Sequence, residues 1–344
     1  MTPYLDYALS GASSILSLLW GSFVSVLSYP VDHTTRLFLP YVATSMLFGI
    51  WVLAAQHRRE IGSGHQGLTG YVSGLFPREV WSQQSSKVDS RFFLPHQMVR
   101  IWIYGPFMAG AVLVVSGATH EISKEWLGPE PVFGHVDSFW TKMAITLLVA
   151  LVNDFTAYIS HWAQHKVPFL WEFHRVHHSA VVLNPLSNYR EHPVDNIFYA
   201  IVFSLGLGLT TGGLLTLFGV VPTHFIIAGV AAPMFLFNVL GYHLRHSHIW
   251  IRWPGPFALL FGSPAHHQIH HSCKPEHIDK NLAFMFPIWD WLFGTYHLPK
   301  QRPEMIMGLG DGTESQYNSF ARIYALPFIR LFSTRDGESL GYKS

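Results

Sequence analysis

Apolar residues collect in long stretches along the 344-residue chain, each close to the roughly 20 residues that a helix needs to cross a bilayer. These stretches are Tyr7 to Leu27, Leu37 to Ala55, Ile101 to Ala118, Phe139 to Ser160, Ile197 to Val220 and Val221 to Gly241. The first is the weakest, because Ser and Gly residues interrupt it. The last two are joined almost without a loop at Pro222, so we expect either a tight hairpin of two spans, which gives six, or a half-inserted re-entrant pair. The pattern predicts an all-α, polytopic membrane protein with about four to six transmembrane helices and a helical cap.

The composition supports a lipid environment. Hydrophobic residues make up 49% of the chain and charged residues 12%, whereas soluble globular proteins have about 25% charged residues. The net charge of +1 gives no sign of a nucleic-acid partner. Cys273 is the only cysteine, which excludes an intrachain disulfide and a cysteine-based zinc or iron–sulfur site. The N-terminal residues lack a basic region and a small-residue cleavage site, so we do not expect a signal peptide.

Basic residues between the apolar stretches predict the orientation in the membrane. The loop from His57 to Arg100 contains six Arg and Lys residues, whereas the loop from Thr119 to Ser138 contains Lys124 alone against four acids. Under the positive-inside rule the first loop faces the cytoplasm. Counting crossings from that loop places His161, which follows the fourth stretch, at the cytoplasmic membrane surface, together with the later histidine motifs.

Histidines recur at helical spacing from the end of the fourth stretch onward. The chain has 22 histidines, and 14 of them lie between His161 and His271. The segment LWEFHRVHHS contains an HxxHH box, SPAHHQIHHS repeats it, and SHWAQH supplies an HxxxH pair before both. Residues at i, i+3 and i+4 share one face of a helix, so the imidazoles of each box are expected to point the same way. The three boxes comprise His161, His165, His174, His177, His178, His267, His270 and His271.

A lone histidine is usually a hydrogen-bonded core or surface residue, but eight at these spacings predict convergent metal ligands. Eight imidazoles are too many for one closed site of four ligands, so we expect two metal ions. His246 is the first candidate to complete the ligand shells, and His192 is the second. His243 and His248 are weaker candidates. His266 is expected to be a neighbour of the ligands, and His224 is expected to be structural. Imidazole suits zinc, copper, iron and nickel, so the ligand type leaves the metal open.

Acidic residues near the boxes are few. Asp154 lies seven residues before His161 and shares its helix face. Its carboxylate is therefore a candidate hydrogen-bond partner for the second ring nitrogen of a ligand histidine. The alternative is a polar residue near the helix end without such a role. The scarcity of acids disfavours a carboxylate-bridged site of the ferritin type. The glycines of GLGLTTG, Gly206 to Gly212, lack the preceding strand of a nucleotide loop and predict close helix packing.

The order of the motifs resembles a known family. HxxxH, then LWEFHRVHHS, NYREHP, SPAHHQIHHS and DKNLAFMFPIWDWLFGTYHLP resemble the fatty acid hydroxylase and sterol desaturase superfamily of integral membrane non-haem di-iron oxygenases, over about Trp140 to Pro299. The resemblance implies that the eight box histidines, joined by His246 or His192, bind two iron ions, or zinc after purification. It also implies that O2 and two electrons serve to hydroxylate or desaturate a lipid: a sterol, fatty acyl chain, sphingolipid, carotenoid or ether lipid. The HLRHSH segment around His246 departs from the family's forms.

No motif in the sequence would carry electrons, because CxxCH, a dinucleotide fingerprint and a thiolate cluster are all absent from it. We therefore expect an external electron donor such as a ferredoxin or cytochrome b5, with a membrane lipid as substrate. The chain divides into N-terminal membrane helices with the basic loop (1–138), a catalytic region (139–299) and a C-terminal cytoplasmic tail (300–344). Within the tail, Ala321 to Phe332 is expected to form a short amphipathic helix.

Two other functions compete with a lipid oxygenase. A metal transporter would carry ionisable ligands in the middle of its spans, whereas these boxes lie just beyond them. A zinc-dependent membrane hydrolase would usually pair its metal with a nearby carboxylate base, as in HExxH, and the sequence contains no such motif.

Overall fold

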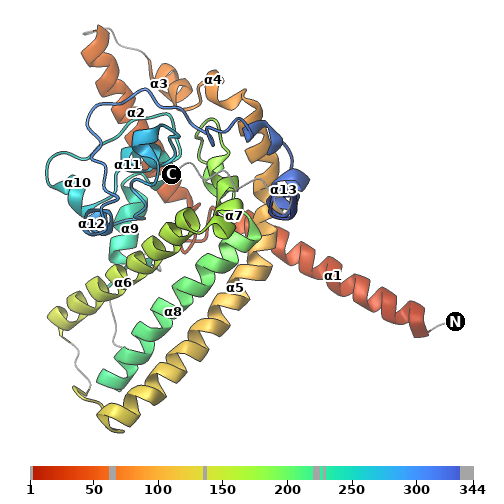
Figure 1. The fold of residues 1–344 in the computed structure, drawn as a ribbon, viewed down its shortest axis with the longest axis vertical. Helices are drawn as coiled ribbons and strands as arrows, with labels where there is room; N and C mark the ends of the chain where they lie inside the picture. Colours follow the sequence, from red (N-terminus) through yellow and green to blue (C-terminus); the bar gives the residue numbers. More distant parts are fainter. Residues whose placement is uncertain (1–2, 62–66, 135–137, 220–224, 228–229, 334–344) are drawn as a thin grey trace.

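The computed structural model describes residues 3–61, 67–134, 138–219, 225–227 and 230–333 and is almost entirely helical there (Figure 1). Four of its helices are long and apolar enough to cross a membrane, namely α2, α5, α6 and α8. The longer helices are α1 (Pro3–Ser28), α2 (Leu39–Ile61), α5 (Gln84–Leu127), α6 (Phe139–Lys166), α7 (Pro168–His178), α8 (Pro193–Phe218) and α13 (Phe320–Ser333). The short ones are α3 (Leu68–Leu75), α4 (Arg78–Trp81), α9 (Ala232–Val239), α10 (Phe257–Leu260), α11 (Pro264–His270) and α12 (Ile288–Leu292). The prediction of an all-α, polytopic membrane protein is confirmed.

The expected hairpin of two spans, and with it the count of six, is wrong for the residues described. After α8 the chain does not form a second span: the described part of Val221 to Gly241 holds a two-stranded ribbon, β1 (Ile226–Ile227) with β2 (Val230–Ala231), and the eight-residue helix α9. Eight helical residues cover only about 12 Å, too short for a bilayer. The count of six spans is therefore too high for the residues described, where α1 contributes only the shorter apolar segment Leu16–Ser28.

The predicted loop before the third span is largely helical. Helix α5 begins at Gln84 and continues for 44 residues, so the apolar stretch from Ile101 to Ala118 is its middle part. At about 1.5 Å per residue, a helix of this length extends roughly 66 Å, about twice the hydrocarbon thickness of a bilayer. Its N-terminal turns thus leave the membrane region and form part of the cap.

Helices α5, α6 and α8 lie side by side, with the end of α5, the start of α6 and the end of α8 at the end away from the histidines (Figure 1). Glycines in α8 allow this close approach. A Cβ atom on Gly208 would lie 2.6 Å from Cβ of Val115 in α5, and one on Gly212 would lie 2.6 Å from Cβ of Thr119. Only hydrogen fits at these positions, so the interpretation of the glycine segment as a helix-packing surface is confirmed.

A proline sets the sharp turn between α6 and α7. Val167 precedes Pro168 and has extended backbone angles (φ −96°, ψ 114°), as steric clash with a proline ring demands, so α6 stops at Lys166. Pro168 then occupies the first turn of α7, where its missing N–H costs nothing. Helix α11 starts similarly at Pro264, after Ser263, whose side chain forms a capping box with His266. These helix starts bring the three histidine boxes to one end of the bundle.

The C-terminal tail fastens the outer face of α7. Its helix α13 coincides with the predicted amphipathic segment and buries Ile323 and Leu326 against Val88 and Phe92 of α5 and Val176 of α7. Beside this apolar cluster, Arg330 Nε of α13 donates to Glu172 Oε2 of α7 at 2.9 Å. Helix α7 is thus packed on one side by α13, while its other side carries the first HxxHH box.

Candidate metal centre

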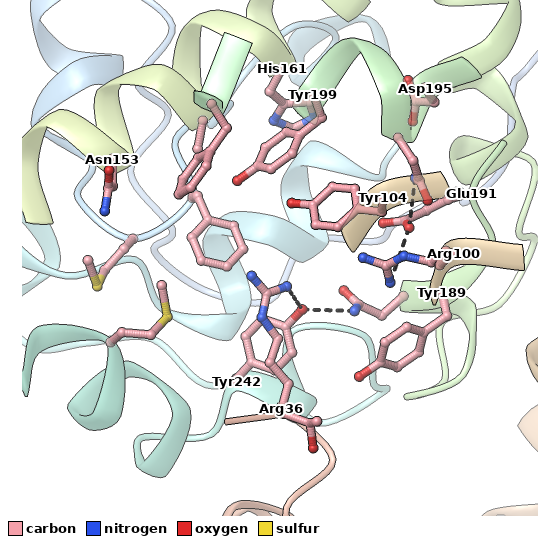
Figure 2. A pocket seen from close by; sticks show the side chains of 18 of the residues that line it. Arg36, Arg100, Tyr104, Asn153, His161, Tyr189, Glu191, Asp195, Tyr199 and Tyr242 are labelled. Carbon is pink, nitrogen blue, oxygen red and sulfur yellow. Dashed lines mark hydrogen bonds and ion pairs between the residues drawn. The ribbon is translucent and has the colours of Figure 1, made fainter. Parts of the chain in front are cut away.

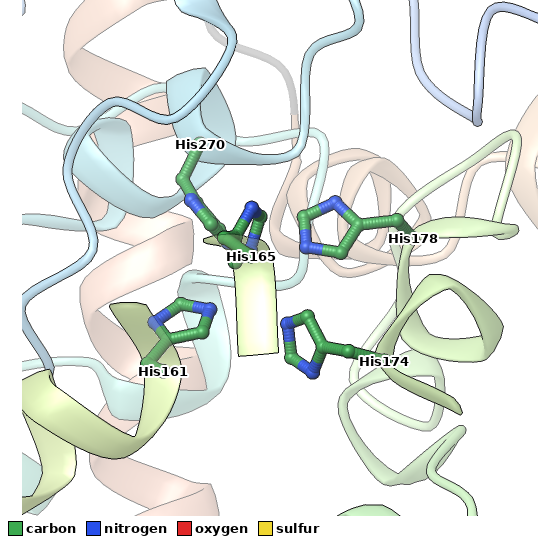
Figure 3. A group of neighbouring side chains, drawn as sticks. All are labelled: His161, His165, His174, His178 and His270. Atoms are coloured by element: carbon green, nitrogen blue, oxygen red, sulfur yellow. The ribbon is translucent and has the colours of Figure 1, made fainter. Parts of the chain in front are cut away.

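Nine histidines from α6, α7, the segment after α9 and α11 gather at the end of the bundle in two groups. Group A consists of His161, His165, His174, His178 and His270; group B consists of His177, His246, His267 and His271. Within each group the candidate ligand nitrogens all lie within 4.8 Å of one another. Figure 3 shows the five rings of group A turned toward a common centre. All eight box histidines and His246 therefore meet, as the sequence predicted that they would.

The two HxxHH boxes are shared between the groups in a reciprocal way. The first box gives His174 and His178 to group A and its middle histidine, His177, to group B. The second box gives its outer pair to group B and its middle histidine, His270, to group A. The groups adjoin, because the ring of His178 in group A lies 4.5 Å from that of His271 in group B, centroid to centroid. Adjacent histidines in one box thus serve neighbouring sites.

Burial keeps these imidazoles neutral. Eight of the nine are buried, and His161 is half-buried. Burial lowers the pKa of His174 to about 3 and that of His177 to about 4, and it lowers the pKa values of His267 and His270 well below 6.5. A neutral imidazole offers an unshared electron pair to a metal ion, whereas an imidazolium cannot.

Oxygen acceptors fix the outer ring nitrogens of group A. Nδ1 of His174 lies 3.1 Å from Oδ2 of Asp195, and Nδ1 of His161 lies 2.7 Å from the carbonyl oxygen of Leu282. The others are His165 Nδ1 to Asp279 Oδ1 at 3.2 Å and His270 Nδ1 to the Lys280 carbonyl at 3.0 Å. An acceptor at Nδ1 holds the proton there and turns the Nε2 electron pair inward. Consistent with this, Nε2 of His174, His178 and His270 is buried and has no hydrogen-bond partner.

Three of these four acceptors come from one short segment after the second box, residues 279–282. Asp279 and Asn281 both have left-handed backbone angles, with φ of 56° and 55°. Such angles are uncommon for residues other than glycine and cluster at functional sites. The Asn281 side chain holds its turn by donating to the carbonyl oxygens of His266 and His297. The residue types of Lys280 and Leu282 do not reveal this role, because every residue carries a backbone carbonyl.

Group B has different neighbours. Nδ1 of His246 lies 2.9 Å from Oγ of Ser187, and Nδ1 of His267 lies 2.8 Å from Nη2 of Arg245. A guanidinium can only donate, so His267 accepts at Nδ1. Its Nε2 lies 2.8 Å from Nε2 of His246 and 3.1 Å from Nε2 of His271. His177 hydrogen-bonds to the backbone of Arg190 and leaves Nδ1 without a partner.

The remaining candidate histidines lie outside both groups. His192 caps α8: its Nδ1 accepts from the Val194 N–H, and its Nε2 lies 3.1 Å from the carbonyl oxygen of Tyr324. His243 and His248 each bind a backbone carbonyl, and His266 takes part in the cap of α11. His224 lies outside the described residues.

Asp154 does not contact a histidine ring. Its two carboxylate oxygens accept from the backbone N–H groups of Met285 and Phe286, both at 2.8 Å, and from Trp289 Nε1 at 3.1 Å. The proposed partnership with a ligand ring nitrogen is therefore wrong. Asp154 instead links α6 to the segment after the second box, because backbone N–H groups of that segment donate to both of its oxygens. Asp195 and Asp279, two of the few acids near the boxes, take the role expected of Asp154.

A cavity of about 740 Å³ adjoins both groups (Figure 2). His161, His174, His177 and His267 line it, and it continues between α5, α6 and α8. Its lining along α6 runs from Ala150 to Gln164, which is about 20 Å of helix. Apolar lining residues include Ala157, Phe203, Met234 and Met285, while Arg36, Arg100, Tyr189, Glu191 and Tyr242 make another part polar.

The part of the chain that builds these groups matches a family model. The model, described as fatty acid hydroxylase, covers residues 146–295, which include all nine histidines of the two groups. Through this region the chain is similar to the fatty acid hydroxylase and sterol desaturase superfamily. The resemblance seen in the sequence is confirmed. No solved structure matches the chain.

Several characterised members of the superfamily are similar to this chain. Alkylglycerol monooxygenase of Caenorhabditis elegans is 28% identical over 57% of this chain and 35% of its own length, and that of Homo sapiens is 32% identical over 48% and 33%. Ornithine lipid hydroxylase OlsE of Rhizobium tropici is 29% identical over 58% of this chain and 56% of its own length. The match thus spans about a third of the alkylglycerol monooxygenases and about half of OlsE. The match to this family and the four apolar helices together support an integral membrane protein.

The residues present fit a pair of metal ions. Two nitrogens bound to one ion at about 2.1 Å can be no more than about 4.2 Å apart. The nitrogens within each group already lie within 4.8 Å of one another, so small movements suffice. The buried Nε2 atoms of His174, His178 and His270, which have no hydrogen-bond partner, point to the same conclusion, because buried polar atoms otherwise find partners.

Proposed function

We propose that this chain is a membrane-bound di-iron oxygenase that hydroxylates or desaturates a C–H position of a lipid with O2 and electrons from a separate donor protein. The observation that carries the proposal is the pair of adjoining, buried histidine groups beside a cavity that continues between the membrane helices. The proposed ligands are the nine histidines of groups A and B. His192 is not among them, because both its ring nitrogens are engaged elsewhere.

Iron held by imidazoles, with coordination positions left open, supplies the reductive activation of O2 that attack on an unactivated C–H bond needs. The residues of this chain provide the setting. Burial keeps the imidazoles neutral, and Asp195 with the 279–282 segment orients them. Ala157 and Phe203 offer apolar contacts for a hydrocarbon chain on the way to His161 and His174.

The names of the relatives support a lipid substrate with a polar head. One is an alkylglycerol monooxygenase and another an ornithine lipid hydroxylase, so each name joins a lipid to insertion of oxygen. The reaction proposed here therefore acts on a lipid drawn from the bilayer. A ferredoxin or a cytochrome b5 type protein is the proposed electron donor, since the sequence holds no electron-carrying motif.

We also propose that both groups face the cytoplasm. Arg58 and Arg59 end α2, and Arg78 begins α4, so these basic residues flank the candidate span on the cap side. The positive-inside rule then places the cap, and the donor protein that it meets, in the cytoplasm.

The deciding experiment combines metal analysis with isotope labelling. The full chain would be expressed with ample iron, purified in nanodiscs, reduced, and exposed to oxygen-18 gas with a membrane lipid extract, followed by lipid mass spectrometry. We expect about two irons per chain and oxygen-18, or loss of two hydrogens, in one lipid class. Zinc alone, with lipid cleavage that needs neither O2 nor reductant, would replace the proposal with a hydrolase.

A further inference from the structure

The cavity beside the histidine groups contains cations that lack acidic partners. Arg36 precedes α2, and its Nη1 donates to the hydroxyl of Tyr242 at 2.7 Å. Arg245 lies between the ribbon and α11, is 5% exposed, and contacts Nδ1 of His267. Among the described residues, no carboxylate oxygen lies within the 4.0 Å of an ion pair from either guanidinium. Asp154, the acid that affects Arg245 electrostatically, is already occupied by two backbone N–H groups.

The two guanidinium groups contact the same aromatic rings. Cζ of Arg36 and Cζ of Arg245 are each 4.8 Å from the centroid of the Phe284 ring. The two carbons are therefore at most twice that distance apart. Both also lie over Tyr242, at 4.8 Å and 5.8 Å from its centroid. Aromatic faces hold the cations in position without neutralising their charge.

Arg100, the third cation of the cavity, is already matched. Its Nη1 lies 3.6 Å from Oε2 of Glu191, as Figure 2 shows. Burial alone would raise the pKa of Glu191, but Arg100 and His96 outweigh burial and hold it well below its usual value. Glu191 is thus an anion committed to Arg100 and to Asn196, whose Nδ2 donates to it at 3.0 Å. Among the described residues, Arg36 and Arg245 are thus the cations of the cavity without an ion-pair partner.

A charge that is removed from water without a partner is costly, and such sites are usually completed by a ligand of opposite charge. The cavity supplies further donors beside Arg36: Asn188, whose Nδ2 donates to the Tyr242 hydroxyl at 2.8 Å, and the hydroxyls of Tyr189 and Tyr199. These groups suit an oxyanion. The apolar lining contributed by Phe203, Met234 and Ile101 suits a hydrocarbon chain attached to it.

We propose that this cavity binds the anionic head of the lipid substrate, a phosphate or a carboxylate, with Arg36 and Arg245 as the recognising cations. The proposal rests on the proposed function in one respect, that the bound lipid is the substrate. An anion between the two guanidiniums would place the lipid in contact with the group B wall, since Arg245 touches His267. A neutral head would leave both guanidiniums without an ion-pair partner.

The test measures binding apart from turnover. The iron-loaded full chain in nanodiscs would be titrated, without reductant, with 1-O-hexadecyl-glycerol 3-phosphate, with uncharged 1-O-hexadecylglycerol and with soluble glycerol 3-phosphate. We expect the lipid phosphate to bind at least about tenfold more tightly than the other two, which corresponds to one well-placed charge-assisted contact. Equal affinity of the two lipids would overturn the proposal. Glycerol 3-phosphate binding as tightly as the lipid phosphate would assign the site to a soluble anion and overturn it as well.

Substitutions then assign the effect to Arg36. Arg36→Gln should remove about tenfold of the affinity for the lipid phosphate and leave the affinity for hexadecylglycerol within about twofold. Arg36→Lys keeps the charge and should retain part of the preference. Arg252→Gln removes an exposed arginine outside the cavity lining and serves as the matched control. Iron content and melting temperature report whether each variant folds. If Arg36→Gln keeps the full preference in a folded protein, the assignment to Arg36 is wrong.

The two proposals fail separately. A phosphate preference without oxygen-18 incorporation into any lipid would leave the binding site standing and count against the oxygenase. Oxygen-18 incorporation into lipids of every charge, with equal affinities for the charged and the uncharged lipid, would support the oxygenase and overturn the anion site.

Discussion

Groups A and B are built from the same residue type on the same helices, yet their surroundings differ. In group A, four of five outer nitrogens face carboxylate or carbonyl oxygens. In group B, His246 faces the hydroxyl of Ser187, and His267 faces the donor Arg245. Group A therefore has its protons placed for metal binding. Group B has a conflict at His267, because a ring that accepts at Nδ1 carries its proton at Nε2.

This difference indicates that the two sites hold metal unequally. The close Nε2 contacts within group B are those expected when a proton on His267 is shared toward His246 and His271. Binding of an ion there must displace that proton or separate the ring from Arg245. Group A needs neither change. We therefore expect group A to be the tighter site, and the following predictions test this order.

The largest effect is expected from removing one ligand of each group. His270→Ala in group A and His177→Ala in group B should each abolish lipid oxidation and reduce iron from about two per chain toward one, because a buried site loses a donor. Iron would be measured by mass spectrometry of the purified variants. His192→Ala is the matched control and should keep both irons, since His192 lies outside both groups. Equal iron in all three variants would contradict the ligand assignment.

Asp195→Asn should weaken metal binding to group A by about 10- to 100-fold, as found for other groups that orient a metal-bound histidine. The amide keeps the shape of the side chain but replaces the carboxyl group that contacts Nδ1 of His174. Competition with a chelator measures the change. The control is Glu304→Gln, which alters an exposed acid far from the rings. Unchanged affinity in Asp195→Asn would show that its contact with His174 does not orient the ligand.

In the unsubstituted protein, a chelator should remove iron in two phases, with one ion lost several-fold faster than the other. The fast phase would belong to group B, and it can be assigned because it disappears in His177→Ala. Asp195→Asn should bring the two phases together by weakening group A. A single phase for both ions in the unsubstituted protein would remove the distinction between the groups.

The smallest effect concerns pH in the metal-free protein. The pKa of His174 is lowered to about 3 and that of His177 to about 4 in the folded chain, whereas an unfolded histidine titrates near 6.5. Between these values the unfolded state binds more protons, so stability is highest above pH 6.5 and falls as the pH drops toward 4. The melting temperature of chelated protein should therefore decrease from pH 7.5 to 5.5. A constant melting temperature would indicate that these imidazoles are not held neutral.

The sequence determined much of this protein by local rules. Apolar stretches of sufficient length gave the four spanning helices, and the spacing of the HxxHH boxes placed each set of imidazoles on one face. Pro168 and Pro264 marked where two ligand-bearing helices begin. These features depend on a few neighbouring residues, so the order of the chain reveals them.

The tertiary structure decided how those elements combine. It divided each HxxHH box between two groups and placed His246, but not His192, among them. It also gave the orienting role expected of Asp154 to Asp195 and the 279–282 segment. It also replaced the sixth span by a ribbon and a short helix. Contacts between residues distant in sequence, such as His174 with Asp195 or Arg245 with His267, depend on the angles and distances at which helices pack. No periodicity along the chain records them.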